Sequence, residues 1–310
     1  MMSFAFVFPG QGSQSIGMMN GYSDLTVAKD TFDEASDILK KDLWNLVTNG
    51  PDELLAQTVN TQPLMLTAGV AAYRTWLALG GTKPKVIAGH SLGEFTALVV
   101  GEAISFKDAL TVTQVRAEAM QDAVPAGVGG MAAILGVDDA VIHEICLLAK
   151  EEEVLEPANF NSPGQVVIAG HKSAIERAVV IAKEKGAKRA VILPMSVPSH
   201  CSLLKDAADK LAEALDAISL SVPIIPLIHN VNAKPSNSID EIKYALKTQM
   251  YSPVRWVDCI KSFIPYGIST VYECGPGKVL APLVKRIDAN LTGIAFNDYA
   301  AMKQTLDGVE

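Results

Sequence analysis

A serine lies between two glycines in residues 89–93, which read Gly-His-Ser-Leu-Gly. An apolar run at 86–88 precedes this stretch, and apolar residues at helical spacing follow it. The order predicts a nucleophile elbow, in which a strand ends, a sharp turn exposes Ser91 and a helix begins. The helix N-terminus would offer free N–H groups, including that of Leu92, to an oxyanion on a substrate carbonyl. A turn in which Ser91 only caps the helix is the alternative.

A serine nucleophile needs a base within hydrogen-bond reach, and the chain has five histidines. His143, His171 and His229 lie in predicted helices or strands, where surface or core positions account for them. His90 is the direct neighbour of the serine, and adjacent side chains at an elbow usually diverge. We prefer His200 over His171, because it opens a predicted helix where the chain returns to the main domain.

No acidic residue stands where an α/β-hydrolase places the third member of its triad. Between Ser91 and His200 the acidic residues fall mostly on predicted helices or in the run 151–153. A main-chain carbonyl can orient a histidine and determine its tautomer without adding a charge. The sequence therefore favours a dyad of Ser91 and His200.

The loop after the first predicted strand could contribute a second oxyanion donor. Residues 8–14 read Phe-Pro-Gly-Gln-Gly-Ser-Gln, which lacks Gly-Lys-Ser/Thr and the G-x-G-x-x-G spacing, so nucleotide binding is not expected. Its glycines instead allow close approach of the backbone, and a main-chain N–H near Gln11 would match that of Leu92. An ordinary βα turn is the alternative.

Arg116 lies on the apolar flank of a predicted helix that opens with a capping box at 105–108. A guanidinium in such a place needs a partner, and a substrate carboxylate bound in bidentate fashion would be one. A structural ion pair is the alternative and the commoner arrangement.

Composition narrows the class of protein. The 310 residues are 49% hydrophobic and 19% charged, so the chain can bury a large core. A net charge of −8 argues against nucleic acid or an anionic membrane as the main partner. Four cysteines without a C-x-x-C pair suit a reduced cytoplasmic protein with no disulfide framework and no metal site. The apolar N-terminus lacks a basic region and predicts a buried strand, and no segment reaches membrane-spanning length.

The pattern of the chain predicts an α/β fold: a large α/β-hydrolase-like domain with a parallel sheet core and a smaller inserted ferredoxin-like α+β domain. Residues 1–125 and 200–310 would form the large domain and 126–199 the small one, with a glycine-rich hinge at 125–130 and the active site in the cleft between them. In the insert we expect strands at 131–135, 154–160, 165–169 and 189–193, helices at 138–150 and 172–185, and a turn at 161–164. Beyond it we expect helices at 201–218 and 239–249 and strands at 223–231 and 271–273.

These features together resemble the malonyl-CoA:acyl carrier protein transacylases of bacterial type II fatty acid synthesis. The resemblance covers nearly the whole chain, in the order typical of the family. It rests on residues 6–14, 89–94, Arg116, 159–165, 197–200 and 273–280. The Val-Pro-Ser-His at 197–200 is the fatty-acid type of tetrapeptide and favours a malonyl substrate.

The resemblance implies ping-pong acyl transfer. Ser91 would attack the thioester of malonyl-CoA with His200 as base, and CoA would leave. The phosphopantetheine thiol of acyl carrier protein would then take the malonyl group from the serine. The N–H groups of Gln11 and Leu92 would hold the oxyanion, and Arg116 would pair with the free malonyl carboxylate. The CoA thioester is a substrate, and no cofactor is implied.

The resemblance also implies supporting residues and a partner surface. Family members orient the histidine through main-chain carbonyls near Gln249, and His90 and Asn159 would line the pocket. The family is usually monomeric, so we expect a monomer. Both carrier proteins and this chain are acidic, so docking would need a local basic patch. We expect it to comprise Lys188, Arg189, Lys278, Lys285 and Arg286; ordinary solvated side chains are the alternative.

Two other functions share part of this pattern. A serine thioesterase or esterase would use Ser91 and His200 and let water finish the reaction, but Arg116 and the missing triad acid argue against it. A docking domain for acyl carrier protein would need no catalysis, and the presence of Ser91, His200 and Gln11 argues against that.

Overall fold

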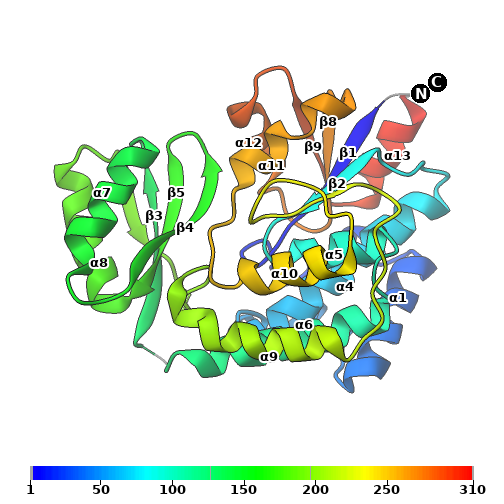
Figure 1. Cartoon of the computed structure of the whole chain (residues 1–310). Helices are drawn as coiled ribbons and strands as arrows, with labels where there is room; N and C mark the ends of the chain where they lie inside the picture. The colour runs from blue at the N-terminus through cyan, green and yellow to red at the C-terminus, as the bar shows by residue number, and fades with distance from the viewer. Residues whose placement is uncertain (1–2, 126, 196, 309–310) are drawn as a thin grey trace.

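The computed structural model describes residues 3–125, 127–195 and 197–308. Met1 and Met2 of the expected first strand, and Ala126 at the expected hinge and domain boundary, lie outside the described residues. Figure 1 shows two sheets, one running through the larger part of the molecule and one at its left-hand side.

The larger part contains a parallel five-stranded sheet with the strand order β7-β2-β1-β8-β9. Its strands are β1 (Phe4–Phe8), β2 (Val86–Gly89), β7 (Leu227–Ile228), β8 (Thr270–Cys274) and β9 (Thr292–Phe296). Successive side chains of a strand point to opposite faces, and in β1 Phe6 joins one core while Val7 joins another. Burial on both faces explains the continuous apolar run of this strand. The predicted α/β fold with a parallel sheet is confirmed.

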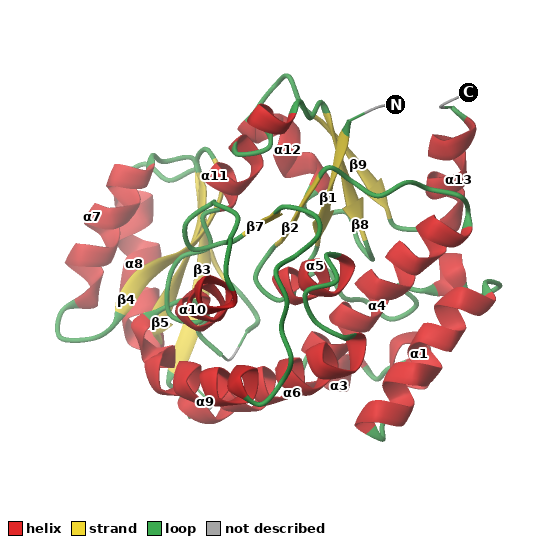
Figure 2. Ribbon diagram, turned by 45° about the vertical axis from the view of Figure 1, so that its right-hand side comes forward, coloured by secondary structure: helices red, strands yellow, loops and turns green. Residues whose placement is uncertain are grey.

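Helices cover both faces of the parallel sheet (Figure 2). They are α1 (Thr26–Leu39), α2 (Leu43–Asn49), α3 (Asp52–Leu55), α4 (Thr58–Ala78), α5 (Gly93–Val100), α6 (Phe106–Ala123), α9 (Lys205–Asp216), α10 (Ile239–Gln249), α11 (Trp256–Lys261), α12 (Ala281–Ile287) and α13 (Tyr299–Asp307), with 3-10 turns at Asn20–Tyr22, Ser202–Leu204 and Ile264–Tyr266. The predicted cap of α6 is present, since the side chain of Ser105 accepts a hydrogen bond from the N–H of Asp108. Within the described ranges, no helix combines the length and the apolar character that crossing a membrane requires.

The second sheet is antiparallel, with the order β4-β5-β3-β6. Its elements are β3 (Gly129–Leu135), α7 (Asp139–Lys150), β4 (Leu155–Ser162), β5 (Gln165–His171), α8 (Lys172–Glu184) and β6 (Arg189–Ile192), in the predicted β-α-β-β-α-β order. Ile134 and Ile168 face α7 and α8, whereas Met131 and Ala169 pack with Cys201 on the opposite face. This opposite face looks toward the parallel sheet, as Figure 1 shows.

Several predicted boundaries are wrong. Strand β3 begins at Gly129, inside the expected hinge, and β5 continues to His171. The strand expected at 223–231 pairs only at Leu227–Ile228, because Pro223 and Pro226 interrupt it and have no N–H to donate. The helix expected from 201 starts with a 3-10 turn, and its regular part is 205–216. The turn expected at 161–164 is shorter, because β4 continues to Ser162, which pairs with Gln165.

Candidate active site

Ser91 lies at the sharp turn between β2 and α5, with a φ angle of +53° in the left-handed region. Strand and helix come so close that a Cβ atom on Gly89 would collide with the backbone of Gly93. A Cβ atom on Gly93 would in turn collide with the main-chain oxygen of Phe8. The N–H of Ser91 donates to Oδ1 of Asn230 at 2.7 Å, and Nδ2 of Asn230 donates to the oxygen of Gly89 at 2.7 Å. Asn230 thus braces a strained turn.

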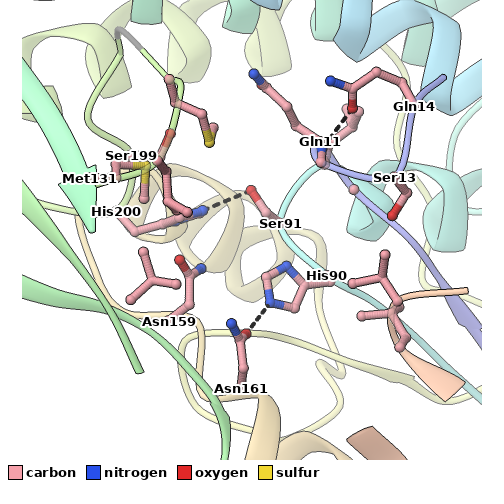
Figure 3. A pocket seen from close by; sticks show the side chains of 18 of the residues that line it. Gln11, Ser13, Gln14, His90, Ser91, Met131, Asn159, Asn161, Ser199 and His200 are labelled. Carbon is pink, nitrogen blue, oxygen red and sulfur yellow. Dashed lines mark hydrogen bonds between the residues drawn. The ribbon is translucent and has the colours of Figure 1, made fainter. Parts of the chain in front are cut away.

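The imidazole of His200 contacts the nucleophile Ser91 on one side (Figure 3) and a main-chain oxygen on the other. Its Nε2 lies 2.8 Å from Oγ of Ser91, and its Nδ1 lies 2.7 Å from the oxygen of Gln249. A carbonyl oxygen can only accept, so Nδ1 carries the hydrogen and Nε2 is free to accept the serine proton. The contact with a carbonyl in place of a carboxylate agrees with the absence of a triad acid from the sequence.

The surroundings keep His200 neutral. Burial, and after it the positive charge of Arg116, lowers the pKa of His200 from 6.5 to about 3, although the hydrogen bond to Gln249 opposes this shift. A neutral imidazole at physiological pH can act as a general base toward the serine hydroxyl.

Arg116 extends from α6 to the nucleophile and is only 1% exposed. Its Nη1 donates to Oε1 of Gln62 at 2.6 Å, and its Nη2 donates to Oε1 of Gln249 at 3.0 Å and to Oγ of Ser91 at 3.1 Å. Burial lowers the pKa of Arg116 to about 10, and the charge of Glu94 opposes the shift. No ion pair in the described part of the chain involves Arg116, so the structural ion pair considered above is not found there.

A buried carboxylate joins the elements behind the nucleophile. Glu94, on the first turn of α5, lies 2.6 Å from Nδ1 of His229. It also accepts the N–H of Asn230 at 3.0 Å and Nε2 of Gln249 at 2.9 Å. Neither Asn230 nor Gln62 was predicted from the sequence, and Glu94 was expected only as the last residue of the 89–94 motif, without a role. Glu94 could have been recognised, because an acidic residue among the apolar residues of a helix indicates a buried carboxylate that needs partners.

A pocket of about 540 Å³ opens above these groups, lined by residues from both sheets and their loops. Gln11, Ser91, Asn159 and His200 line it (Figure 3). A Cβ atom on Gly10 would lie 3.6 Å from the nitrogen of Leu92, so the loop after β1 runs beside the start of α5. Within the described residues, the N–H groups of Gln11 and Leu92 have no hydrogen-bond acceptor.

His90 also lines the pocket. Nε2 of His90 lies 2.8 Å from Oδ1 of Asn161, which was expected only as part of a turn, and the His90 ring packs on Trp256 with centroids 5.2 Å apart. Burial lowers the pKa of His90. His171 accepts the N–H of Val154 within the small sheet. No cluster of three His, Cys, Asp or Glu side chains among the described residues could hold a metal ion.

The five residues of the expected basic patch are all exposed: Lys188, Arg189, Lys278, Lys285 and Arg286. Arg189 pairs with Leu135 across β6 and β3, and Leu135 pairs with Gln165 of β5. Nη1 of Arg286 on α12 donates to Oε1 of Gln165 at 2.7 Å, and Gln165 lines the pocket. Lys188 adjoins Arg189, Lys285 adjoins Arg286, and Lys278 adjoins the pocket-lining Val279.

A serine hydroxyl beside a neutral imidazole is an arrangement suited to acyl transfer, and the comparisons place the chain in that class: it is an acyltransferase. The acyl transferase domain model matches residues 5–288. A malonyl CoA-acyl carrier protein transacylase of Escherichia coli K12 is 50% identical over 99% of this chain and 100% of its own.

Solved structures agree with this relationship. An acyl-carrier-protein S-malonyltransferase from Burkholderia pseudomallei 1710b has a TM-score of 0.96 and 53% identity, covering 99% of this chain and 100% of its own. A malonyl-transacylase in complex with a type II PKS acyl-carrier protein has a TM-score of 0.97 and 46% identity, covering 99% of each chain. The chain belongs to the acyl transferase family and, within it, to the malonyl CoA-acyl carrier protein transacylases.

Proposed function

We propose that this protein transfers the malonyl group from malonyl-CoA to the phosphopantetheine thiol of an acyl carrier protein. One observation carries this function: Ser91 Oγ lies between His200 Nε2 at 2.8 Å and Arg116 Nη2 at 3.1 Å. A base and a cation therefore meet at the same nucleophile, in a chain 50% identical to a malonyl CoA-acyl carrier protein transacylase.

The first half-reaction forms a malonyl-serine ester. His200 Nε2 accepts the hydroxyl proton as Ser91 Oγ attacks the thioester carbonyl. The N–H groups of Gln11 and Leu92 donate to the resulting oxyanion. The carbon–sulfur bond then breaks, and the proton on His200 passes to the departing CoA sulfur.

The second half-reaction reverses these roles. His200 accepts the proton of the carrier's thiol, and the sulfur attacks the ester carbonyl. The bond to Ser91 Oγ breaks, and the proton returns from His200 to that oxygen. Each half-reaction returns the imidazole to its neutral form, so the cycle requires no cofactor.

Selectivity for malonyl follows from Arg116. A malonyl carboxylate is one methylene away from the reacting carbonyl, and the guanidinium contacts the serine oxygen directly. The carboxylate of a bound malonyl group would therefore reach Arg116 through charge-assisted hydrogen bonds. An acetyl group would leave the buried cation without a partner, which is costly.

We further propose that the carrier docks on the basic rim formed by Lys188, Arg189, Lys278, Lys285 and Arg286. Gln165 supports this placement, because it lines the pocket, accepts from Arg286 and lies two strands from Arg189. Neighbouring strands are about 5 Å apart, so Arg189 on β6 lies about 10 Å across the sheet from Gln165 on β5. The chain's net charge of −8 makes such a local patch necessary for an acidic partner.

We also propose that the chain forms two domains, an α/β-hydrolase-like part at 1–125 and 200–310 and a ferredoxin-like part at 126–199. The β4-β5-β3-β6 order of the small sheet and the two faces of the parallel sheet support this division. We also propose that the protein is a monomer and that it is cytoplasmic. The cytoplasmic location is supported by the four free, buried cysteines, which suit a reducing compartment.

Intact-protein mass spectrometry after incubation with malonyl-CoA tests the function. We expect one malonyl adduct on the wild type and none on Ser91→Ala. Addition of carrier protein bearing phosphopantetheine should remove the adduct and produce malonyl-carrier. Free malonate in place of malonyl-carrier would indicate a thioesterase, and an unmodified wild type would indicate a docking module.

A further inference from the structure

Two neutral amides hold the buried cation of the pocket. Nη1 of Arg116 donates to the side-chain oxygen of Gln62 at 2.6 Å, and Nη2 donates to that of Gln249 at 3.0 Å. Both glutamines are essentially buried, with exposures of 1% and 0%. The common partner of a buried arginine is a carboxylate, so a pair of amides is an unusual choice.

The orientation of each amide is determined by the contacts of its nitrogen. Nε2 of Gln62 donates to Oγ1 of Thr58 at 2.8 Å and approaches Sδ of Met120 at 3.4 Å. Nε2 of Gln249 donates to Oε2 of Glu94 and to the main-chain oxygen of Ser91. With each nitrogen occupied by an acceptor, each amide oxygen must face the guanidinium. Gln62 is thus a preset acceptor for Arg116.

The nearest carboxylate does not touch the guanidinium. Glu94 lies behind the Gln249 amide and already binds His229, Asn230 and Gln249. Arg116 is therefore held in place, yet its charge is not cancelled by any contacting anion among the described residues. A buried cation in this condition favours a ligand that brings a negative charge.

We propose that Gln62 is a positioning residue that sets the charge selectivity of the pocket. It fixes Arg116 with a neutral acceptor, so that the carboxylate of the acyl group becomes the counter-ion of the guanidinium. This inference rests on the proposed function, in which Arg116 binds the malonyl carboxylate. A glutamate has almost the same size and could accept the same hydrogen bond from Nη1, but it would neutralise the cation.

The test compares Gln62→Glu with Gln62→Met, a side chain of similar volume that neither accepts strongly nor carries charge. Acylation of Ser91 is measured by intact mass with malonyl-CoA and with acetyl-CoA, each at concentrations below saturation. We expect Gln62→Glu to lower the malonyl-to-acetyl rate ratio about 10- to 100-fold, as for the loss of a charge-assisted hydrogen bond. Gln62→Met should lower the ratio by no more than about threefold, because the cation keeps its charge and its Nη2 still donates to Gln249 and Ser91.

A purely structural role of Gln62 predicts the opposite order. Glutamate, the stronger acceptor, would then preserve the ratio and methionine would lose it, and this result would overturn the proposal. If thermal unfolding shows that Gln62→Glu does not fold, the test rests on Gln62→Met. A tenfold fall in the malonyl-to-acetyl rate ratio of that variant would refute the inference. Failure of the wild type to be acylated by malonyl-CoA would instead count against the proposed function, so the two failures are distinguishable.

Discussion

Nη2 of Arg116 donates a hydrogen bond to Oγ of Ser91 across 3.1 Å, which brings the cation and the nucleophile into direct contact. This contact links chemistry and selectivity, because the group that would bind the far end of the acyl chain adjoins the atom that would attack its near end.

Replacing Arg116 should change selectivity more than catalysis. We expect Arg116→Ala to lower the rate of serine acylation by malonyl-CoA about 10- to 100-fold, because charge-assisted hydrogen bonds to the carboxylate are lost. Acetyl-CoA, which has no carboxylate, should be affected far less. Single-turnover acylation with both thioesters measures the two rates, and an equal fall in both would contradict the assigned role.

The low pKa of His200 predicts a pH-dependent stability. The unfolded chain binds a proton on this histidine near pH 6.5, whereas the folded chain binds it only near pH 3. Between these values the unfolded state holds the extra proton, so the free energy of unfolding should fall as the pH is lowered from 6 to 4. The expected slope is ~1.4 kcal/mol per pH unit relative to His200→Gln. Urea unfolding at several pH values measures it, and parallel curves for the two proteins would argue against a depressed pKa.

The brace behind the nucleophile should matter for both stability and rate. Asn230→Ala leaves the N–H of Ser91 without its acceptor, which should cost about 1–3 kcal/mol of unfolding free energy. The displaced serine should acylate roughly 10- to 100-fold more slowly. The control is Asn232→Ala, which removes an exposed side chain nearby. Matching acylation rates for the two variants would show that Asn230 does not hold the elbow.

The close approach of strand and helix predicts that the elbow tolerates no methyl group. Gly93→Ala would place a Cβ atom against the main-chain oxygen of Phe8, and we expect a loss of about 3 kcal/mol or more of unfolding free energy. Gly130→Ala is the matched control, because its nearest neighbour, a side-chain atom of Ile175, lies 4.0 Å away. Similar urea midpoints for the two variants would contradict the close packing of Gly93 against the main chain of Phe8.

The proposed docking rim makes a prediction about the carrier step alone. Charge reversal by Lys285→Glu with Arg286→Glu should slow transfer to the carrier about tenfold, through loss of electrostatic attraction. Acylation by malonyl-CoA should stay unchanged, because neither residue lines the pocket. The control pair Lys29→Glu with Lys107→Glu makes the same charge change at exposed positions, one on α1 and one on the first turn of α6. An effect of equal size in both pairs would indicate net charge, not docking.

Local signals made much of the fold predictable. The elbow around Ser91 and the cap at Ser105 are encoded within a few residues, because glycine spacing and capping chemistry act over one turn. The helix at 239–249 appears with the predicted bounds. Strand β9 and helix α13 were not predicted, because their apolar patterns are short and the chain end offers few turn signals.

The supports of the site could not be predicted in the same way. Gln62 reaches Arg116 across 54 positions of sequence, and Asn230 reaches Ser91 across 139. Glutamine and asparagine occur widely on protein surfaces, so their types alone do not mark them as buried partners. Their roles follow from the packing of α4, α6 and the segment after β7 around one pocket.

The sequence by itself determined a serine at a strand-to-helix turn, an α/β pattern and the absence of a triad acid, because each depends on neighbouring residues or on composition. Tertiary structure decided which histidine meets the serine, 109 positions away, and that Arg116 contacts two amides and, within the described part of the chain, no carboxylate. These outcomes depend on how the two sheets pack against each other, and distant contacts of this kind leave no periodic or local trace in the chain.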